Sequence, residues 1–583
     1  MRHLLRLLLC ATAMAGAAVQ AAPPKVVTIA RPAPFDSLDP VRQNDAVSAP
    51  LVALLYDSLL QYRYLAPTPQ LEPDLLERMP KLSADKLTYT FTLRKGVRFH
   101  DDACFPGGQG RELTTDDVLF SMKRFGDARL NVKSWFAIAG AVVGYDAFRA
   151  ATAAPGAPSD TAGLDISGFH KIDATRFTLR LTHANPLFLT ALSYASAGIV
   201  PPEAVKMYGE QLANHPVGTG PYVLRSVDRK GVLRFERYER YHGTYPSTGA
   251  PGDAGKGLLK DAGKRVPLID VLLMPLIEEA QPLALQFQRG QIDTEHLDQA
   301  NFARMVVRGP DGGFRVADAW ASRFDVYTYP EQAMFYYGFN MRDPFLGGNK
   351  RLRQALARLV DTRGLIDTLL NGRGIRLQSP VSVIVPGNEH DTGSRLPDYD
   401  LAAAKSLLVQ AGYPGGRGLP VITLSFPAAR LQERNEFDFM KARFAAAGVQ
   451  LAPVFMDNAN FIRRTNGGDF QMMSYGWSGD PDAADFYQQL ITKSIAGGSN
   501  LTAFSNAAYD KEYEAALLLP DGPERYAHFR RMNDILADEM PMVVTYNPIR
   551  VGLKQKWLLN YKPSTLSSEL IYVDVDMTLK QGH

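Results

Sequence analysis

The chain has 583 residues, which is too long for a single hydrophobic core and predicts two or three sub-domains. Hydrophobic residues make up 46% and charged residues 21%, the composition of an ordinary soluble globular protein. The formal net charge is only +3, so the chain lacks the strongly basic character that a nucleic-acid partner requires.

The first 21 residues have the pattern of a secretory signal peptide. Arg2 and Arg6 precede an apolar run from Leu7 to Ala18, and the segment ends in a small-residue cleavage site at Ala21. The run is shorter than the roughly 20 residues that span a membrane. Cys10 follows two leucines and lies too early to be a lipoprotein cysteine. We therefore expect cleavage near Ala21 and a soluble periplasmic protein without lipid.

The first half of the mature chain combines regular elements with two surface insertions. Apolar and polar residues alternate from Thr88 to Leu93, which predicts a half-buried strand. Thr114 to Asp117 (TTDD) offers a capping box ahead of an amphipathic helix. Residues 144–168 and 245–265 are rich in small and turn-forming residues, so we expect exposed excursions there.

The second half alternates strands and helices. Helices are expected after Asn349 and after Asp400, because each is a capping residue followed by apolar positions at helical spacing. Strands are expected at Val421 to Phe426, Val449 to Phe455 and Phe470 to Tyr475. Strand and helix in alternation imply right-handed crossovers in a largely parallel sheet.

The segment after the last of these strands is the best candidate for a binding site. Gly476, with the glycine and proline that follow, is expected to break the backbone, so that Trp477 and Asp480 project from a turn. Ligands bind at the carboxyl ends of strands in open α/β sheets. An aromatic face beside a carboxylate suits a cationic group. The alternative is that Asp480 only caps the turn and that Trp477 is ordinary core.

Three sequence blocks carry a resemblance to a known family. They are Tyr89 to Asp101 (YTFTLRKGVRFHD), Leu113 to Arg124 (LTTDDVLFSMKR) and Pro216 to Tyr222 (PVGTGPY). In this order and spacing they resemble the peptide/nickel-type (family 5) extracytoplasmic solute-binding proteins of ABC importers, which include oligopeptide- and dipeptide-binding proteins. The resemblance extends over nearly the whole mature chain. Asp102 to Glu112 departs from it, because this glycine-rich loop with Cys104 is longer than the family usually has.

The resemblance implies an α/β fold of the periplasmic binding protein type II, bilobal with an additional inserted sub-domain. On this basis residues 1–21 are the signal peptide and 22–315 are lobe I, with the inserted sub-domain at about 66–195. Residues 316–545 would form lobe II, and 546–583 would return to lobe I.

The same resemblance implies a receptor that captures peptides for an ABC importer. In peptide-binding relatives an aspartate three residues after the tryptophan pairs with the ligand's α-ammonium group, which assigns that role to Asp480 beside Trp477. Gly476 and Ser478 would offer backbone groups to the peptide, and Ala46 would line the cleft from lobe I. The expected partners are the solute and the permease subunits at the inner membrane, with the receptor itself a monomer. A nickel chelate, opine, sugar or other amine is the alternative solute.

Catalytic and metal chemistry are not indicated. The segment from Gly476 to Asp480 is superficially similar to a nucleophile elbow, but Asp480 stands where that motif needs glycine. The histidines are scattered without metal-ligand spacing. We therefore expect no catalytic residue, metal or cofactor. A secreted hydrolase remains the alternative of a different class, because triad members need not be adjacent in sequence.

Overall fold

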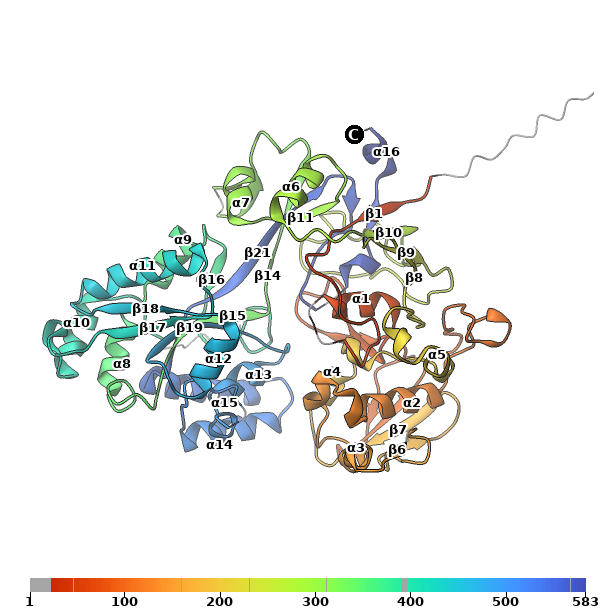
Figure 1. Ribbon diagram of the computed structural model, residues 1–583, viewed down its shortest axis with the longest axis horizontal. Coiled ribbons are helices and arrows are strands. Elements are labelled where there is room, and N and C mark those ends of the chain that lie inside the picture. Colours follow the sequence, from red (N-terminus) through yellow and green to blue (C-terminus); the bar gives the residue numbers. More distant parts are fainter. Residues whose placement is uncertain are drawn as a thin grey trace, which may run out of the picture.

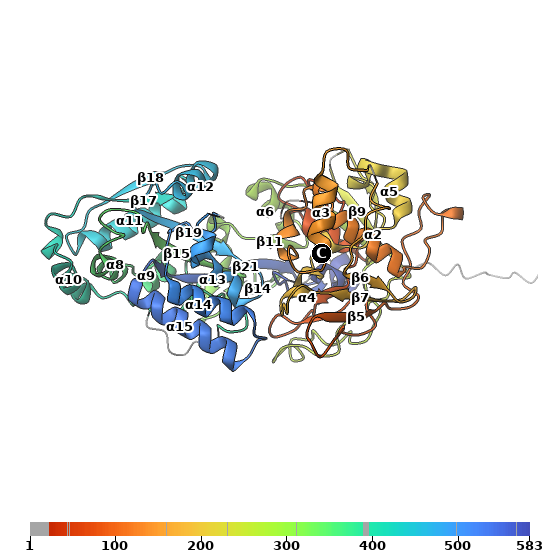
Figure 2. The ribbon, with the colours of Figure 1, turned by 90° about the horizontal axis from the view of Figure 1, so that it is seen from below.

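The computed structural model describes residues 23–582 except 44, 46, 159, 230, 311, 389–395, 497 and 567, so the expected signal peptide lies outside the described residues. The protein has two lobes that lie side by side, as both views show (Figures 1 and 2). Two antiparallel strands, β14 (Phe324–Pro330) and β21 (Tyr546–Gln555), pair over seven residues and run between the lobes. This is the bilobal α/β architecture expected from the sequence. Within the described chain, no helix has the length and apolarity to cross a membrane.

The first lobe is built on a four-stranded sheet in the order β1-β10-β9-β8. β1 and β10 are parallel and the other pairs are antiparallel. The strands are β1 (Val26–Thr28), β8 (Tyr222–Val227), β9 (Leu233–Arg237) and β10 (Val271–Met274). Helix α1 (Ser48–Leu55) packs against this sheet through an apolar cluster that includes Leu51 and Leu55.

A second, antiparallel sheet belongs to the same lobe, in the order β4-β5-β7-β6. Its strands are β4 (Lys81–Leu82), β5 (Thr88–Thr92), β6 (Phe169–Lys171) and β7 (Arg176–Arg180). The alternation in β5 is confirmed, since Tyr89 and Phe91 are buried and their neighbours are half-exposed. The capping box is also confirmed, because the Asp117 carboxylate accepts from the Thr114 amide at 2.8 Å where α2 (Thr115–Gly126) begins. Short elements complete this region: β2 (Leu60–Tyr62), β3 (Leu71–Pro73), α3 (Tyr145–Ala153), α4 (Phe188–Ala191) and α5 (Pro202–Tyr208).

The second lobe is built on a five-stranded sheet in the order β18-β17-β19-β15-β20. Its strands are β15 (Ala333–Phe339), β17 (Ile422–Phe426), β18 (Leu451–Phe455), β19 (Met472–Ser478) and β20 (Met542–Val544). β17 is parallel to β18 and to β19, as expected. β15 runs against both of its neighbours, so the sheet is largely parallel with one reversed strand.

Eight helices surround this sheet among the described residues (Figure 1). The expected caps are present: the Asn349 side chain accepts from the Leu352 amide, and the Asp400 side chain accepts from the Ala403 amide. The helices are α8 (Lys350–Ala357), α9 (Thr362–Thr368), α10 (Leu401–Gln410), α11 (Leu431–Ala445), α12 (Asn458–Asn466), α13 (Ala483–Tyr487), α14 (Ala507–Leu517) and α15 (Pro523–Glu539).

The chain ends on the first lobe. After β21, the Trp557 indole N–H donates to Asp293 at 2.6 Å, and the ring of Tyr572 stacks on that of Tyr64 at 4.4 Å. The remaining elements lie around the crossing strands and the C-terminus: α6 (Ala280–Gln288), β11 (Thr294–His296), α7 (Gln299–Met305), β12 (Val306–Arg308), β13 (Phe314–Val316), β16 (Gly374–Arg376), β22 (Leu558–Leu559), β23 (Asp574–Val575) and α16 (Met577–Gln581).

The expected break at Gly476 is wrong. β19 continues through Gly476 and Trp477 to Ser478, because β15 pairs with it along its whole length and Phe335 stands opposite Gly476. A Cβ atom at position 476 would come within 3.0 Å of the Phe335 ring, so glycine accommodates the aromatic neighbour here rather than ending the strand. The turn begins only at Gly479.

Candidate ligand-binding cleft

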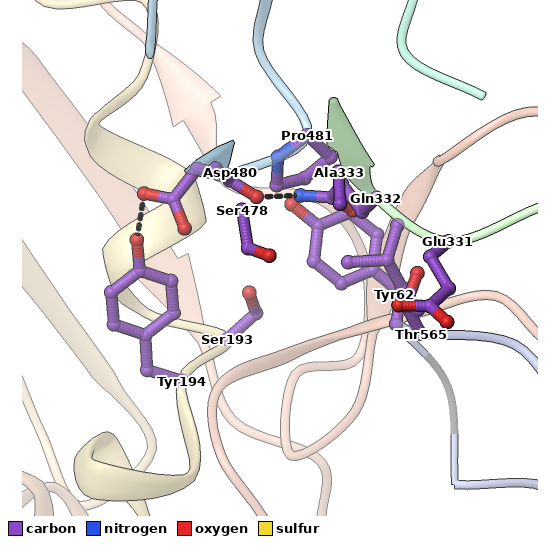
Figure 3. A pocket seen from close by; sticks show the side chains of 12 residues that line it. Tyr62, Ser193, Tyr194, Glu331, Gln332, Ala333, Ser478, Asp480, Pro481 and Thr565 are labelled. Carbon is purple, nitrogen blue, oxygen red and sulfur yellow. Dashed lines mark hydrogen bonds between the residues drawn. The ribbon is translucent and has the colours of Figure 1, made fainter. Parts of the chain in front are cut away.

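A cavity of about 370 Å³ lies between the lobes at the carboxyl end of β19. The second lobe contributes the end of β19 with its turn and the loop between β14 and β15, and the first lobe contributes β2, the loop after α4 and a C-terminal segment. Figure 3 shows the side chains that surround it. The lining residues are Tyr62, Ser193, Tyr194, Glu331, Gln332, Ala333, Ser478, Gly479, Asp480, Pro481, Thr565 and Leu566.

Asp480 connects the two lobes across this cavity. Its carboxylate oxygen Oδ2 accepts a hydrogen bond from the Tyr194 hydroxyl (Figure 3). Burial raises the pKa of Asp480 and the nearby Asp482 adds to the rise, while the Tyr194 hydrogen bond opposes it. Burial and the Asp480 charge raise the pKa of Tyr194, so the phenol remains a donor at neutral pH.

The turn after β19 is capped by residues other than Asp480. The Asp480 amide donates to Asp485 at 2.9 Å, and the Asp482 carboxylate accepts from the Ala484 amide at 2.7 Å at the start of α13. The Asp480 carboxylate therefore points across the cleft and does not close its own turn. This arrangement disfavours the alternative in which Asp480 serves only as a turn cap.

The three aspartates of this turn differ in charge compensation. Asp482 receives two hydrogen bonds from the buried Arg525, at 2.6 and 2.8 Å. Within the described chain, neither Asp480 nor Asp485 forms an ion pair with a lysine, arginine or histidine. Burial and the adjacent Asp480 raise the pKa of Asp485 to about 7. A cationic ligand group in the cleft would therefore stabilise the ionised form of these two carboxylates.

Gln332 holds the turn from the other side. Its Nε2 amide donates to the Gly479 carbonyl (Figure 3). Its Oε1 atom is buried and has no hydrogen-bond partner among the described residues. The hydroxyls of Ser193 and Ser478 point toward one another in the same space (Figure 3). The cavity wall thus supplies the carboxylates of Asp480 and Glu331 and several hydroxyl groups, among them those of Ser193 and Ser478.

A second cavity of about 500 Å³ lies on the other side of the Tyr194–Asp480 contact and shares both residues with the first. Four acidic side chains line it, from Asp480, Asp482, Asp485 and Glu514, and none of its lining residues is a lysine or arginine. The two cavities together form a cleft with an acidic wall on the second lobe.

The expected ligand residues fall in different places. Ser478 and Asp480 line the first cavity. Gly476 and Trp477 lie further back along β19 and are not among its lining residues, and the Trp477 ring packs half-buried against a core cluster of the second lobe. Ala46 lies outside the described residues.

Sequence reasoning missed Tyr62, Tyr194, Gln332 and Asp485. Tyr194 is 286 positions away from Asp480, in a short segment with no motif, so no pattern in the chain joins them. Gln332 lies in the short connection between β14 and β15, where the sequence indicates only an ordinary turn residue. Asp485 could have been suspected, because three aspartates within six residues cannot all be solvated beside a buried strand.

Two lobes joined by paired strands, with a polar cleft between them, define a solute-binding protein. The sequence agrees: residues 70–498 match the family model described as bacterial extracellular solute-binding proteins, family 5 middle. The chain belongs to this family, whose members are solute-binding receptors.

Curated relatives match over most of their length. The chain is 25% identical over 528 residues to the dipeptide-binding protein of Escherichia coli K12, covering 88% of this chain and 87% of that protein. It is 26% identical over 542 residues to heme-binding protein A of Haemophilus influenzae, covering 90% and 87%. The names of these two relatives indicate different ligands, a dipeptide for one and heme for the other.

Solved structures show the same fold. HbpA2 from Haemophilus parasuis aligns with a TM-score of 0.74 at 21% identity, over 95% of this chain and 99% of that one. The periplasmic binding protein DppA from Helicobacter pylori, in complex with the peptide STSA, aligns with a TM-score of 0.67 at 21% identity, over 94% and 98%.

Proposed function

We propose that this protein is a periplasmic receptor that captures small peptides and delivers them to the permease subunits of an ABC importer. The observation that carries the proposal is the Asp480 carboxylate, which lines the cleft cavity without a cationic partner among the described residues. Every peptide with a free N-terminus presents an ammonium group, so one fixed carboxylate recognises it regardless of sequence. The names of relatives that bind dipeptides support this solute class.

The ammonium group would pair with Asp480 from inside the cavity. The Tyr194 hydroxyl donates to Oδ2 of Asp480, which leaves the other carboxylate oxygen for the ligand. With the lobes together, both charges lose water, and a charge-assisted hydrogen bond in such a setting is stronger than in solvent. The ligand would then strengthen the same inter-lobe contact that Tyr194 makes. Closure of two lobes around the solute is a hinge motion at β14 and β21.

The peptide main chain would add to the edge of β19. β17 pairs with β19 only at Met472 and Met473, so beyond Met473 that edge of β19 has no partner strand among the described residues. An extended peptide can donate to and accept from such an edge, which gives affinity without side-chain specificity. Gly476 and Ser478 lie in this stretch, so their backbone groups are the candidates named from the sequence.

The receptor would act without covalent chemistry and would be exported and cleaved near Ala21. No histidine, lysine or arginine is among the lining residues of the first cavity, and its two carboxylates are that of Glu331, which pairs with Arg550 at 2.7 Å, and that of Asp480, which the proposal assigns to the ligand. We expect the solute to be recovered unchanged after denaturation of the complex. Turnover that disappears in a Ser478→Ala variant would favour a hydrolase instead.

Calorimetry with a bound peptide and its N-acetylated form tests the proposal. Removing the Asp480 charge leaves the ammonium unpaired, so Asp480→Asn should cost about 2–5 kcal/mol for the free peptide, or roughly 30- to several-thousand-fold in affinity. Wild type should reject the acetylated peptide strongly and the variant far less. Asp469→Asn is the matched control, because Asp469 is an exposed aspartate of the same lobe. Equal affinity of wild type and Asp480→Asn for the free peptide would exclude the assigned role.

A non-peptide amine is the second candidate solute. The first cavity offers a carboxylate but no lysine or arginine that would meet a peptide's C-terminal carboxylate. An organic amine with a single positive charge would need only the carboxylate of Asp480 as its partner. Native mass spectrometry of freshly purified protein distinguishes the two, because the mass of the retained solute identifies a peptide directly.

A further inference from the structure

Three side chains from distant parts of the first lobe meet in its interior. Asp57, Asp74 and His242 each place one donor atom within 4.8 Å of the others. None of the three lines the cavity that holds Asp480. The cluster is therefore separate from the ammonium site proposed above.

The backbone explains how the two carboxylates come together. β2 and β3 pair antiparallel, and the pairing continues past their ends, with the Asp74 amide donating to the Leu59 carbonyl at 3.2 Å. This extension sets the segment of Asp57 beside Asp74. His242 arrives from the loop after β9, where its ring packs against Tyr241 at 4.7 Å between ring centres.

Both carboxylates are buried, and Arg94 is a nearby positive charge but not an ion-pair partner of either. Asp57 is 3% and Asp74 5% exposed. Within the described chain, no lysine or arginine forms an ion pair with either, and Arg94 donates to the main-chain carbonyl of Asp74 instead. Two charges buried side by side are costly unless a cation or a proton compensates them.

The donor atoms lie close together around the imidazole ring, with Asp57 Oδ2 3.8 Å from His242 Nδ1. Among the described residues Asp74 Oδ1 is buried and has no hydrogen-bond partner, although His242 Nε2 approaches it to 3.3 Å. That separation equals the edge of a tetrahedron with metal–ligand distances of about 2.0–2.1 Å. Asp57 Oδ2 accepts from the Thr219 hydroxyl at 2.8 Å, which is the kind of outer partner that orients a metal-bound carboxylate.

A small cavity lies against the two carboxylates and borders the cleft. It has a volume of about 90 Å³, and Asp57 and Asp74 both line it. It shares Tyr62, Ser193 and Leu566 with the cavity that holds Asp480. An ion held by the two carboxylates would therefore lie next to the cleft.

We propose that Asp57, Asp74 and His242 form a binding site for one divalent transition-metal ion, with Zn²⁺ as the reference cation. Two carboxylates and a neutral imidazole balance the charge of M²⁺, and a mixed nitrogen and oxygen ligand set suits Zn²⁺ or Mn²⁺ better than Mg²⁺. The bound ion ties together three chain segments that lie under the ligand cleft. Ligands spread over positions 57, 74 and 242 have no recognisable spacing, which is why the sequence indicated no metal.

The test is metal binding by the full-length, untagged mature protein. After chelation, titration with Zn²⁺ and in parallel with Mn²⁺ should show one ion bound per chain, and Zn²⁺ should raise the melting temperature because it binds the native state. Asp74→Asn and His242→Gln should each weaken binding by more than the roughly 10- to 100-fold that loss of an outer partner costs. Asp74→Asn also removes one of the two buried charges, so its metal-free form should melt no lower than wild type.

His215→Gln is the matched control, because His215 is half exposed, pairs with Asp102 at 2.7 Å and is not a member of the cluster. It should bind the ion like wild type. The proposal is overturned if wild type binds neither Zn²⁺ nor Mn²⁺ at one per chain. It is equally overturned if Asp74→Asn and His242→Gln both bind as tightly as wild type. Failure of peptide binding in Asp480→Asn would not affect either outcome, since Asp480 is not part of this cluster.

Discussion

The Tyr194 hydroxyl donates to the Asp480 carboxylate across the cleft, and it joins residues 286 positions apart on different lobes. The contact divides the cleft into two cavities, both of which include these two residues. A carboxylate that receives one donor from the opposite lobe is positioned before the ligand arrives. Under the proposed function, the first lobe would thereby take part in recognising a group that the second lobe binds.

Replacing Tyr194 by phenylalanine should weaken binding of an ammonium ligand. The hydrogen bond stabilises the ionised carboxylate, so its loss should cost about 1.5–3 kcal/mol, or roughly 10- to 150-fold in affinity. Calorimetry with the free peptide measures this. Tyr208→Phe is the control, because Tyr208 donates to Asp102 at 2.7 Å away from the cleft. Unchanged affinity in Tyr194→Phe would show that the contact is only structural.

The stability of the ligand-free protein should depend on pH through Asp485. Its folded-state pKa is raised to about 7, so the folded protein keeps a proton that the unfolded chain releases above about pH 4. This contribution is fully present below pH 4 and is lost as the pH rises through 7. Metal-free wild type should therefore melt at a lower temperature at pH 8 than at pH 5, with a smaller difference in Asp485→Asn. An unchanged difference in that variant would contradict the assignment, and Asp469→Asn serves as the exposed control.

Much of the fold could be predicted because its signals are local. The Thr114–Asp117 capping box, the cap residues Asn349 and Asp400 and the alternation of β5 each depend on a few adjacent residues. The break at Gly476 was predicted wrongly for the same reason. Pairing with β15 is a tertiary interaction, and it keeps a glycine in an extended strand against its local preference.

The site could be predicted only in part. Asp480 could be proposed from the sequence because it follows a strand at a family-like spacing from Trp477, and in the structure it lines the cleft. Its partner Tyr194 and the supporting Gln332 could not be found, since long-range contacts between lobes leave no periodic or motif signal. The cluster of Asp57, Asp74 and His242 is hidden in the same way, because only folding brings its members together.

The buried Arg525 should be important for stability. Its guanidinium pairs with Asp482, whose side chain is only 8% exposed, and also with Asp521. Arg525→Met would leave the Asp482 carboxylate buried and unpaired, so the free energy of unfolding should fall by about 3–5 kcal/mol. Urea denaturation measures the change. In the control Arg464→Met, the lost ion pair with Asp469 is exposed, so the cost should be below about 1 kcal/mol. Similar losses in both variants would argue against a special role for the buried pair.

Gln332 should determine how well the Asp480 turn is held for the ligand. Gln332 is 7% exposed, and its Nε2 donates to the Gly479 carbonyl, directly before Asp480. Methionine has a similar length without the amide. Gln332→Met should therefore leave the Gly479 carbonyl unpaired and loosen the turn that carries Asp480. The lost hydrogen bond is worth about 0.5–1.5 kcal/mol, so the affinity for the free peptide should fall by up to roughly tenfold.

The N-acetylated peptide separates this effect from that of Asp480. Because Gln332→Met keeps the carboxylate, the variant should still reject the acetylated peptide strongly, whereas Asp480→Asn should not. Gln354→Met is the matched control, since Gln354 also donates to a main-chain carbonyl of the second lobe, that of Asp538 at 2.7 Å, but does so on the exposed surface. Wild-type affinity in Gln332→Met would contradict the positioning role. Loss of discrimination against the acetylated peptide would contradict it too, because the ammonium partner would then depend on Gln332 as much as on Asp480.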